Sequence, residues 1–296
     1  MATKRNNQFG IAHKLFMVTV VAILGVLFSR PAAAAPAADH PLVYVVTATG
    51  NLPGTEAQFG TVDLATGAFH QIGPDTPQGQ ANLVPGPHGE LLSLTFSGDL
   101  ESIDPANGKI SVIGATGLDG LAVDLAEVDR KLYATDLSNN LYTVNPETGA
   151  ATLIGPTGIP AVPGIGTPNM PLYDESLYGA RGKLYETFDV LVGYSFPFTA
   201  LIDPELYVID PETGVATVVG PTIINASALV EVNGTFYLFK VVPGPSPSPL
   251  SSAAAVYILD LKNGNTRFVT NVETTASAVL GAFPVNRTRR DFPHRR

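Results

Sequence analysis

The sequence predicts an all-β fold built from repeated antiparallel hairpins, and three observations support this prediction. The 296 residues include 29 glycines and 25 prolines, which interrupt the chain too often for long helices. Hydrophobic residues make up 45% of the chain and charged residues only 15%, so the chain can bury a core. One hairpin phrase recurs five times.

The chain has no cysteine, which excludes disulfides, thiolate metal sites, cysteine nucleophiles and lipid-bearing cysteine anchors.

Residues 1–38 are expected to be a secretory signal peptide rather than part of this fold. Three basic residues, Lys4, Arg5 and Lys14, precede a 14-residue apolar stretch at 15–28, which an alanine-rich run follows. A basic segment, an apolar core and a small-residue cleavage zone are the parts of a signal peptide. The alternative, an uncleaved membrane anchor, needs ~17–25 apolar residues, and this stretch is shorter. We therefore expect a secreted or periplasmic protein without membrane association after cleavage.

Removal of this leader leaves a strongly acidic domain at 39–285. The domain has 8 basic and 25 acidic residues, a formal net charge of −17, compared with −9 for the whole chain. Such a surface repels nucleic acid and anionic lipid, so neither is an expected partner. The segment 286–296 contains five arginines, and we expect it to be a basic disordered tail rather than a binding patch.

The repeated phrase is typical of a β-hairpin with a tight turn. A strand of the type Leu-Tyr-x-Ile leads into Asp or Asn, a turn ends in Gly, and a second strand reaches a β-branched residue five positions later. The Asp or Asn side chain accepts a hydrogen bond from a later backbone N–H, and Gly adopts the left-handed conformation that lets twisted strands pair. We interpret these Asp and Asn residues as turn formers, not metal ligands. The phrases are 59–67, 100–108, 141–149, 206–214 and 256–264, and the turn formers are Asp63, Asp104, Asn145, Asp210 and Asp260.

Two further strands precede most hairpins and complete a four-stranded unit. A short apolar strand (a), such as 121–123 or 228–232, comes before a Leu-Tyr strand (b), and the hairpin supplies strands c and d. Four-stranded meanders repeated at this period are propeller blades. Successive turn glycines are 41, 41, 65 and 50 residues apart, and the two ends of the domain together supply another 49 residues. The spacing therefore predicts five blades.

The two ends of the domain carry complementary strands. The strand 42–47 is of type b with no a strand before it, and 276–283 is of type a with no b strand after it. If the C-terminal strand pairs in the N-terminal blade, the ring closes and no sheet edge stays open. The sequence thus predicts a five-bladed β-propeller of four-stranded antiparallel blades, and we expect a monomer.

The unit Leu-Tyr-x-Ile-Asp-Pro-x-Thr-Gly, followed by Ile-Gly, resembles the repeats of secreted bacterial β-propellers of the quinoprotein-like and Tyr-Val-Thr-Asn type. The resemblance covers about 247 residues, the whole of 39–285. It implies the architecture but no activity, because propellers of this kind include lyases, dehydrogenases, surface-layer proteins and ligand binders. The chain has no tryptophan, and therefore lacks the Trp docking pattern of the quinoprotein dehydrogenases. A quinone cofactor is not expected.

In a four-stranded meander the b–c and d–a connections lie on the same face of the ring. All long insertions fall in these connections, so we expect them on one face. They are 48–57, 155–174, 187–205 and 241–254. The Pro- and Ser-rich segment 241–250 is expected to be disordered. The segment 189–198 is the better binding candidate, because exposed Tyr194, Phe196 and Phe198 would supply contact area. The alternative is that this loop packs its aromatic rings on the blade below.

Polar residues at the start of the inner strands are expected around the channel mouth on the same face. They are Asn82, Asp119, Asp174, Glu175, Asn225 and Thr275. The carboxylates of Asp119, Asp174 and Glu175 suit a Ca²⁺ ion, a sugar, or the paired acids of glycoside chemistry. The alternative is that they only cap strand ends and solvate the channel. No zinc, calcium-loop, phosphate-loop or nucleophile-elbow motif occurs, so no cofactor is expected beyond a Ca²⁺ at the mouth.

Two functions from different classes follow from these features. The favoured one is a non-catalytic secreted propeller that binds a small molecule, a glycan or an extracellular protein on the inserted-loop face. Its expected contact residues are Asn82, Asp119, Glu175, Tyr194, Phe196, Phe198 and Asn225. The alternative is an extracellular hydrolase or lyase that uses Asp119, Asp174 and Glu175. A catalytic site needs a pair of groups with perturbed pKa values in a cleft, whereas a binding site needs only shape and contact area.

Overall fold

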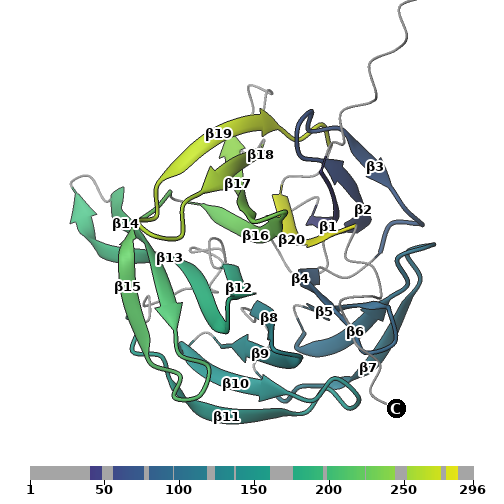
Figure 1. Cartoon of the computed structure of the whole chain (residues 1–296), viewed down its shortest axis with the longest axis horizontal. Coiled ribbons are helices and arrows are strands. Elements are labelled where there is room, and N and C mark those ends of the chain that lie inside the picture. The colour runs from purple at the N-terminus through teal and green to yellow at the C-terminus, as the bar shows by residue number, and fades with distance from the viewer. Residues whose placement is uncertain are drawn as a thin grey trace, which may run out of the picture. The chain divides into compact units, whose positions relative to one another are not determined.

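The computed structural model shows a five-bladed β-propeller, as the sequence predicts (Figure 1). Its described residues form five four-stranded antiparallel sheets around a central axis. These residues are 41–48, 56–76, 80–95, 97–118, 124–136, 138–160, 176–195, 199–223, 225–243, 252–274 and 278–285. None of the segments described is a helix with the length and apolarity that a membrane span requires.

Each blade is a meander whose first strand lies nearest the axis (Figure 1). Blade 1 consists of β20 (Ala278–Pro284), β1 (Leu42–Ala48), β2 (Ala57–Asp63) and β3 (Phe69–Gln71). Blade 2 consists of β4 (Gln80–Pro85), β5 (Leu91–Thr95), β6 (Asp99–Ile103) and β7 (Ile110–Ala115). Blade 3 consists of β8 (Asp124–Val128), β9 (Lys131–Thr135), β10 (Asn140–Val144) and β11 (Ala151–Pro156). Blade 4 consists of β12 (Ser176–Ala180), β13 (Lys183–Ser195), β14 (Thr199–Ile209) and β15 (Ala216–Pro221). Blade 5 consists of β16 (Ala226–Val232), β17 (Thr235–Pro243), β18 (Ser252–Leu259) and β19 (Thr266–Asn271).

The C-terminal strand closes the ring, which confirms the prediction from the two ends of the domain. β20 pairs antiparallel with β1, from Val43 opposite Pro284 to Ala48 opposite Ala278. The inner strands of neighbouring blades also contact each other all the way round, in the order β20, β4, β8, β12, β16. The inner strands of all five blades thus form a continuous ring of contacts.

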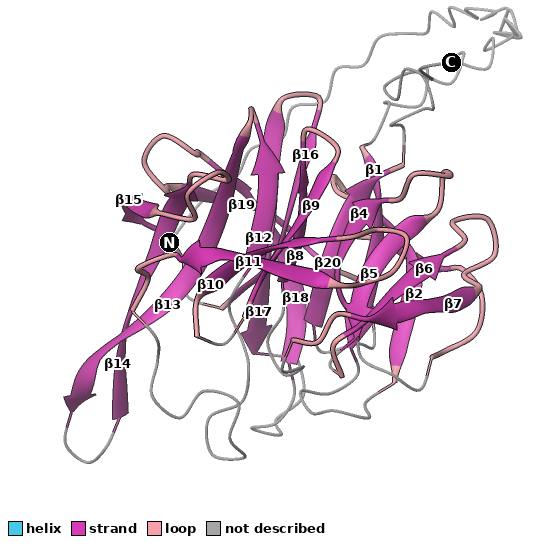
Figure 2. Ribbon diagram, turned by 90° about the horizontal axis from the view of Figure 1, so that it is seen from below, coloured by secondary structure: helices cyan, strands magenta, loops and turns pink. Residues whose placement is uncertain are grey.

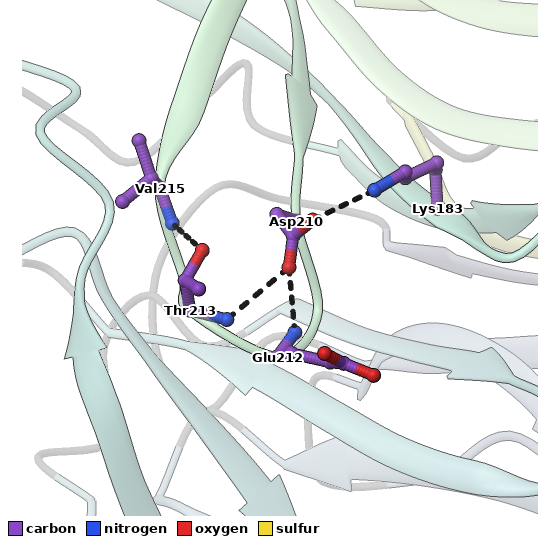
Figure 3. Close-up of polar contacts among 5 residues, drawn as sticks. All are labelled: Lys183, Asp210, Glu212, Thr213 and Val215. Carbon is purple, nitrogen blue, oxygen red and sulfur yellow. Dashed lines mark hydrogen bonds and ion pairs between the residues drawn. The ribbon is translucent and has the colours of Figure 1, made fainter.

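The tight c–d turns form as the sequence predicts, and blade 4 shows the chemistry most fully (Figure 3). The Asp210 Oδ1 atom accepts hydrogen bonds from the backbone N–H groups of Glu212 (3.0 Å) and Thr213 (3.2 Å). The other carboxylate oxygen, Oδ2, accepts a bond from the Lys183 ammonium at 2.7 Å. Hydrogen bonds, first of all the one from Lys183, lower the pKa of Asp210 to about 2. The other four turn formers accept the same backbone bond, two residues ahead, at 2.8–2.9 Å.

Glycines of the repeat also make the contact between neighbouring blades. A Cβ atom on Gly149, which ends the turn of blade 3 with φ +79°, would lie 2.4 Å from the carbonyl oxygen of Gly114 at the end of β7. Both positions need glycine, because a Cβ on Gly114 would lie 2.3 Å from the Thr148 carbonyl oxygen. Equivalent approaches join the remaining blades, and at the closing junction Gly67 of blade 1 lies against Asn271 of blade 5. The repeat therefore specifies blade packing as well as the hairpin.

The core is divided among the five junctions between blades. Each buried hydrophobic cluster combines residues of two neighbouring blades, so every blade is apolar on both faces. In the junction between blades 1 and 2, for example, Phe59 and Val46 of blade 1 pack with Leu91 and Ile103 of blade 2. Because side chains alternate along a strand, one face of each blade meets the preceding blade and the other meets the following one. A polar side chain inside such a junction is therefore a departure from the pattern.

Two boundaries expected from the sequence are wrong, and a third, the strand expected at 121–123, stays a prediction. The segment 187–205 is not a loop, since β13 runs to Ser195 and pairs with β14 as a ribbon that extends beyond blade 4 (Figure 2). The inner strand of blade 3 is Asp124–Val128, whereas 121–123 lie outside the described residues. The first part of the segment expected to be disordered belongs to β17, which ends at Pro243. The leader 1–38 and the tail 286–296 lie outside the described residues, so both stay predictions.

Candidate functional site

The structure describes only some of the residues predicted to form a site. Asn82 and Asn225 are described in full, and Tyr194 lies in β13 opposite Ala200. The backbone N–H of Asn225 donates to Asp189 Oδ2 of β13 at 3.2 Å, so this residue joins blades 4 and 5. The other predicted residues lie outside the described residues: Asp119, Asp174, Glu175, Phe196, Phe198 and Thr275. Their roles in ligand binding, catalysis or Ca²⁺ binding stay predictions.

Asn82 lies inside the ring, on an irregular part of the inner strand β4. Its φ is +57°, only 5% of its surface is exposed, and the pairing of β4 with β5 shifts register here. Its backbone lies so close to β20 that a Cβ on Gly281 would come within 2.4 Å of the Asn82 carbonyl carbon. The Asn82 side-chain amide donates to Asp124 Oδ1 of blade 3 at 2.6 Å. Asn82 thus links inner strands.

Asp124 is the centre of this polar network. Its Oδ2 atom accepts a hydrogen bond from the backbone N–H of Leu177 in β12 at 3.2 Å, so one carboxyl group joins blades 2, 3 and 4. The inner edge of a blade has no further strand to pair with, and a side-chain acceptor satisfies its N–H groups instead. Burial raises the pKa of Asp124 to about 7, although both hydrogen bonds oppose this rise.

Glu186 is a second buried carboxyl group at the same junction. It lies in β13, its side chain is 0% exposed, and Thr135 of blade 3 donates a hydrogen bond to its Oε1 at 3.4 Å. Its Oε2 has no hydrogen-bond partner among the described residues. Burial, followed by the charge of nearby Asp124, raises the pKa of Glu186 to about 8. The equivalent positions of the other blades hold Val45, Ser93, Ala134 and Leu238.

Among the described residues, the inner strands pack closely around the axis. The inner strands leave a cavity of about 20 Å³ there, lined by residues such as Leu83, Leu125, Leu177 and Leu229. A cavity needs about 10–15 Å³ to hold one water molecule, so this one has room for a single water. Asp124 and Glu186 are themselves buried, at 9% and 0% exposed, and each is hydrogen-bonded to a neighbouring blade.

An accessible cleft lies instead at the junction of blades 1 and 2. Its volume is about 550 Å³, within the range of about 300–1,000 Å³ that is usual for small-molecule sites. One wall is the connection from β3 to β4, which a bridge between Thr76 and Ala57 ties to blade 1. The other wall is blade 2 with its c–d turn. The lining residues are Pro74, Asp75, Thr76, Gln80, Glu101, Asn107, Gly108, Lys109 and Ile110.

Glu101 is the buried charged residue of this cleft, and it departs from the repeat. It lies in β6 on the same face as Ile103, which packs against blade 1, and it is 4% exposed. The equivalent position holds tyrosine in blades 3, 4 and 5, and glycine in blade 1. These residues are Tyr142, Tyr207, Tyr257 and Gly60. A glutamate is shorter than a tyrosine, so blade 2 places a carboxyl group where blades 3, 4 and 5 place a ring.

Among the described residues, the hydrogen-bond partner of the Glu101 carboxyl group is Gln80 of the same blade. The Gln80 amide donates to Glu101 Oε2 at 3.0 Å, while Gln80 Oε1 has no hydrogen-bond partner among the described residues. Burial is the main reason that the pKa of Glu101 is raised, and the nearby Asp99 adds to the rise. At the rim, Asp75 Oδ1 accepts bonds from the amides of Gln58 (3.1 Å) and Gln71 (2.7 Å). The floor of the cleft therefore presents hydrogen-bond acceptors.

Sequence reasoning did not select the four buried polar residues of these two junctions: Gln80, Glu101, Asp124 and Glu186. A signal for Glu101 was present, because glutamate replaces the tyrosine that three other repeats have at this position. Gln80 and Asp124 lie on inner strands, where the repeat is weakest, and Glu186 lies on the second strand of blade 4. Within the described part of the chain, no three His, Asp or Glu side chains gather closely enough to hold a metal ion.

Comparisons with known proteins add no functional information. No protein-family model matches the chain. No curated protein matches it either. The resemblance to quinoprotein-like and Tyr-Val-Thr-Asn propellers therefore stays a prediction from the repeat, and the site has to be interpreted from its own chemistry.

Proposed function

We propose that this protein is a non-catalytic propeller that captures a small polar ligand in the cleft between blades 1 and 2. The observation that carries the proposal is Glu101, a buried carboxyl group that opens a cleft of about 550 Å³ where three other blades have tyrosine. Buried charge is costly, so a chain that needs only a stable junction gains nothing from this substitution. A ligand that hydrogen-bonds the carboxyl group supplies a reason for it.

The cleft lies apart from the contact residues predicted around the channel mouth, none of which lines it, but it shares one class of connection with the predicted face. Asp75 and Thr76 belong to the d–a connection between blades 1 and 2, the class of connection in which the long insertions occur. The cleft continues from there to the c–d turn at Lys109. The rigid blades on both sides keep its acceptors in place, which lowers the entropic cost of binding.

Export and a protein partner belong to the same proposal. Cleavage near the alanine-rich end of 1–38 would release the acidic domain to the periplasm or medium, and N-terminal sequencing of protein from the producing cells tests this. The ribbon formed by β13 and β14 carries Tyr194 beyond the blade, and it is the surface on which we propose that an extracellular protein would dock.

The test restores the repeat residue in blade 2. Glu101→Tyr places a ring in the cleft, and Ser102→Tyr adds the same ring on the other face of β6 as a matched control. Wild type and both variants are screened by thermal shift and ligand-observed NMR against amino acids, amines, organic acids, and mono- and disaccharides. We expect a ligand whose binding is lost in Glu101→Tyr and kept in Ser102→Tyr. If every ligand found binds Glu101→Tyr as tightly as wild type, the proposal is wrong.

A further inference from the structure

We infer that the ligand of the cleft between blades 1 and 2 is a small organic cation, whose N–H groups bind the acceptors around Glu101. This inference rests on the function proposed above and specifies its ligand class. Four features of the described residues support it: unused acceptors on the floor, a carboxylate at the rim, the acidic charge of the domain, and the chemistry of the lining.

The floor offers acceptors that the protein does not use. Gln80 is 1% exposed, and its Oε1 has no hydrogen-bond partner among the described residues. The Gln80 amide occupies one oxygen of Glu101, Oε2, and no bond to Oε1 occurs within the described part of the chain. A buried acceptor without a donor is destabilising. A ligand rich in donors relieves this at Gln80 and can also bind the adjacent Glu101.

Charge favours a cation over a neutral donor. Glu101 is buried, which disfavours an uncompensated carboxylate, and a nearby positive charge would stabilise its ionised form. Asp75 adds a second carboxylate, and the Gln58 and Gln71 amides both bind its Oδ1, which leaves Oδ2 on the rim. Charge-assisted hydrogen bonds are about twice as strong as those between neutral groups.

The charge of the whole domain acts in the same direction. The segment 39–285 has a formal net charge of −17, which concentrates cations near its surface and repels organic acids and phosphates. The described lining contains no aromatic ring on which a sugar could stack. A neutral glycan would therefore bind through uncharged hydrogen bonds alone, and an anion would meet Glu101 and Asp75.

Lys109 provides an independent test of the sign of the charge. It lines the cleft from the c–d turn of blade 2 and is exposed. Its ammonium group repels a cationic ligand, so Lys109→Ala should strengthen binding. Asp75→Asn removes an attractive charge while keeping the Oδ1 acceptor, and should weaken binding. A structural role for these two residues would not move affinity in opposite directions.

The experiment compares three probes of the same chain length: putrescine, 1,4-butanediol and succinate. Calorimetric titrations of the purified protein at low salt and pH 7.5 should show binding of putrescine and none of the other two. Glu101→Gln should weaken putrescine binding by about tenfold or more, since it replaces a charge-assisted bond. Added salt should weaken binding in wild type more than in Glu101→Gln. Circular dichroism checks that each variant is folded. If Glu101→Gln does not fold, Asp75→Asn and Lys109→Ala, which change exposed residues, test the inference instead.

The outcomes separate this inference from the proposed function. If butanediol or a sugar binds as tightly as putrescine, and Glu101→Tyr abolishes that binding, the cleft binds a ligand but the cation inference is wrong. If putrescine binds Glu101→Gln and wild type equally, it binds elsewhere and the inference is also wrong. If no cation binds and no compound in the wider screen is sensitive to Glu101→Tyr, both proposals fail.

Discussion

The buried carboxyl group of Glu186 should make the stability of the propeller fall as the pH rises. Its pKa increases from the ordinary value of 4.5 to about 8 in the folded protein. Between these values the folded protein keeps a proton that the unfolded chain releases, so stability is fully present below about pH 4.5 and is lost as the pH rises through about 8. Asp124, whose pKa rises from 3.8 to about 7, acts in the same direction.

The size of the effect follows from the same values. A rise from 4.5 to about 8 corresponds to about 5 kcal/mol, at about 1.4 kcal/mol per pKa unit. This is an upper limit, because water that enters the junction between blades 3 and 4 lowers the cost of the charge. We expect wild type to lose about 1–3 kcal/mol of unfolding free energy between pH 5 and pH 8.

Glu186→Gln is the informative variant, because glutamine can still accept the hydrogen bond from Thr135 but has no proton to release. In urea unfolding at pH 5, 6, 7 and 8, it should be more stable than wild type by about 1–3 kcal/mol at pH 8 and close to wild type at pH 5. Glu212→Gln, on the exposed turn of blade 4, is the control and should follow wild type at every pH. The reasoning fails if wild type and Glu186→Gln lose stability in parallel across this range.

Three further predictions concern the frame of the propeller. Truncation after Asn271 removes β20 and exposes an edge of blade 1, so soluble folded protein should be lost. Deletion of 286–296 alone should leave the melting temperature nearly unchanged. An unchanged melting temperature in the truncation after Asn271 would contradict ring closure. Gly149→Val forces a β-branched residue to φ +79° and against the Gly114 carbonyl group. It should lower the free energy of unfolding, measured with a chemical denaturant, by at least ~1–3 kcal/mol. An unchanged free energy of unfolding would refute the proposed contact between blades. Asp104→Ala removes one turn hydrogen bond and should cost about 0.5–1.5 kcal/mol without changing the affinity of any ligand; a selective loss of binding would show a functional role for the turn.

The sequence predicts the fold because the same local chemistry recurs in each blade. The phrase around Asp210 specifies a strand, a turn and a return strand, and its five copies at blade spacing specify the ring. The ribbon at 187–205 escaped prediction, since Gly193 and Pro197 suggest a loop in a single sequence and only the pairing with β14 reveals a strand. Asp124 escaped because it directly follows the apolar residues 121–123 and so suggested a strand boundary, whereas here its carboxyl group accepts a hydrogen bond from the inner edge of blade 4.

Glu101 and Glu186 show why one departure from the repeat forms a cleft and another does not. Both side chains face the preceding blade, and both are buried. Blade 3 meets Glu186 with the Thr135 hydroxyl and with Asp124, so this carboxyl group stays enclosed. Glu101 receives its bond from Gln80 of its own blade, and the facing position of the cleft is open. We therefore propose that a buried carboxyl group binds a ligand where the neighbouring blade leaves space, as at Glu101, and has a structural role where that blade fills the space, as at Glu186.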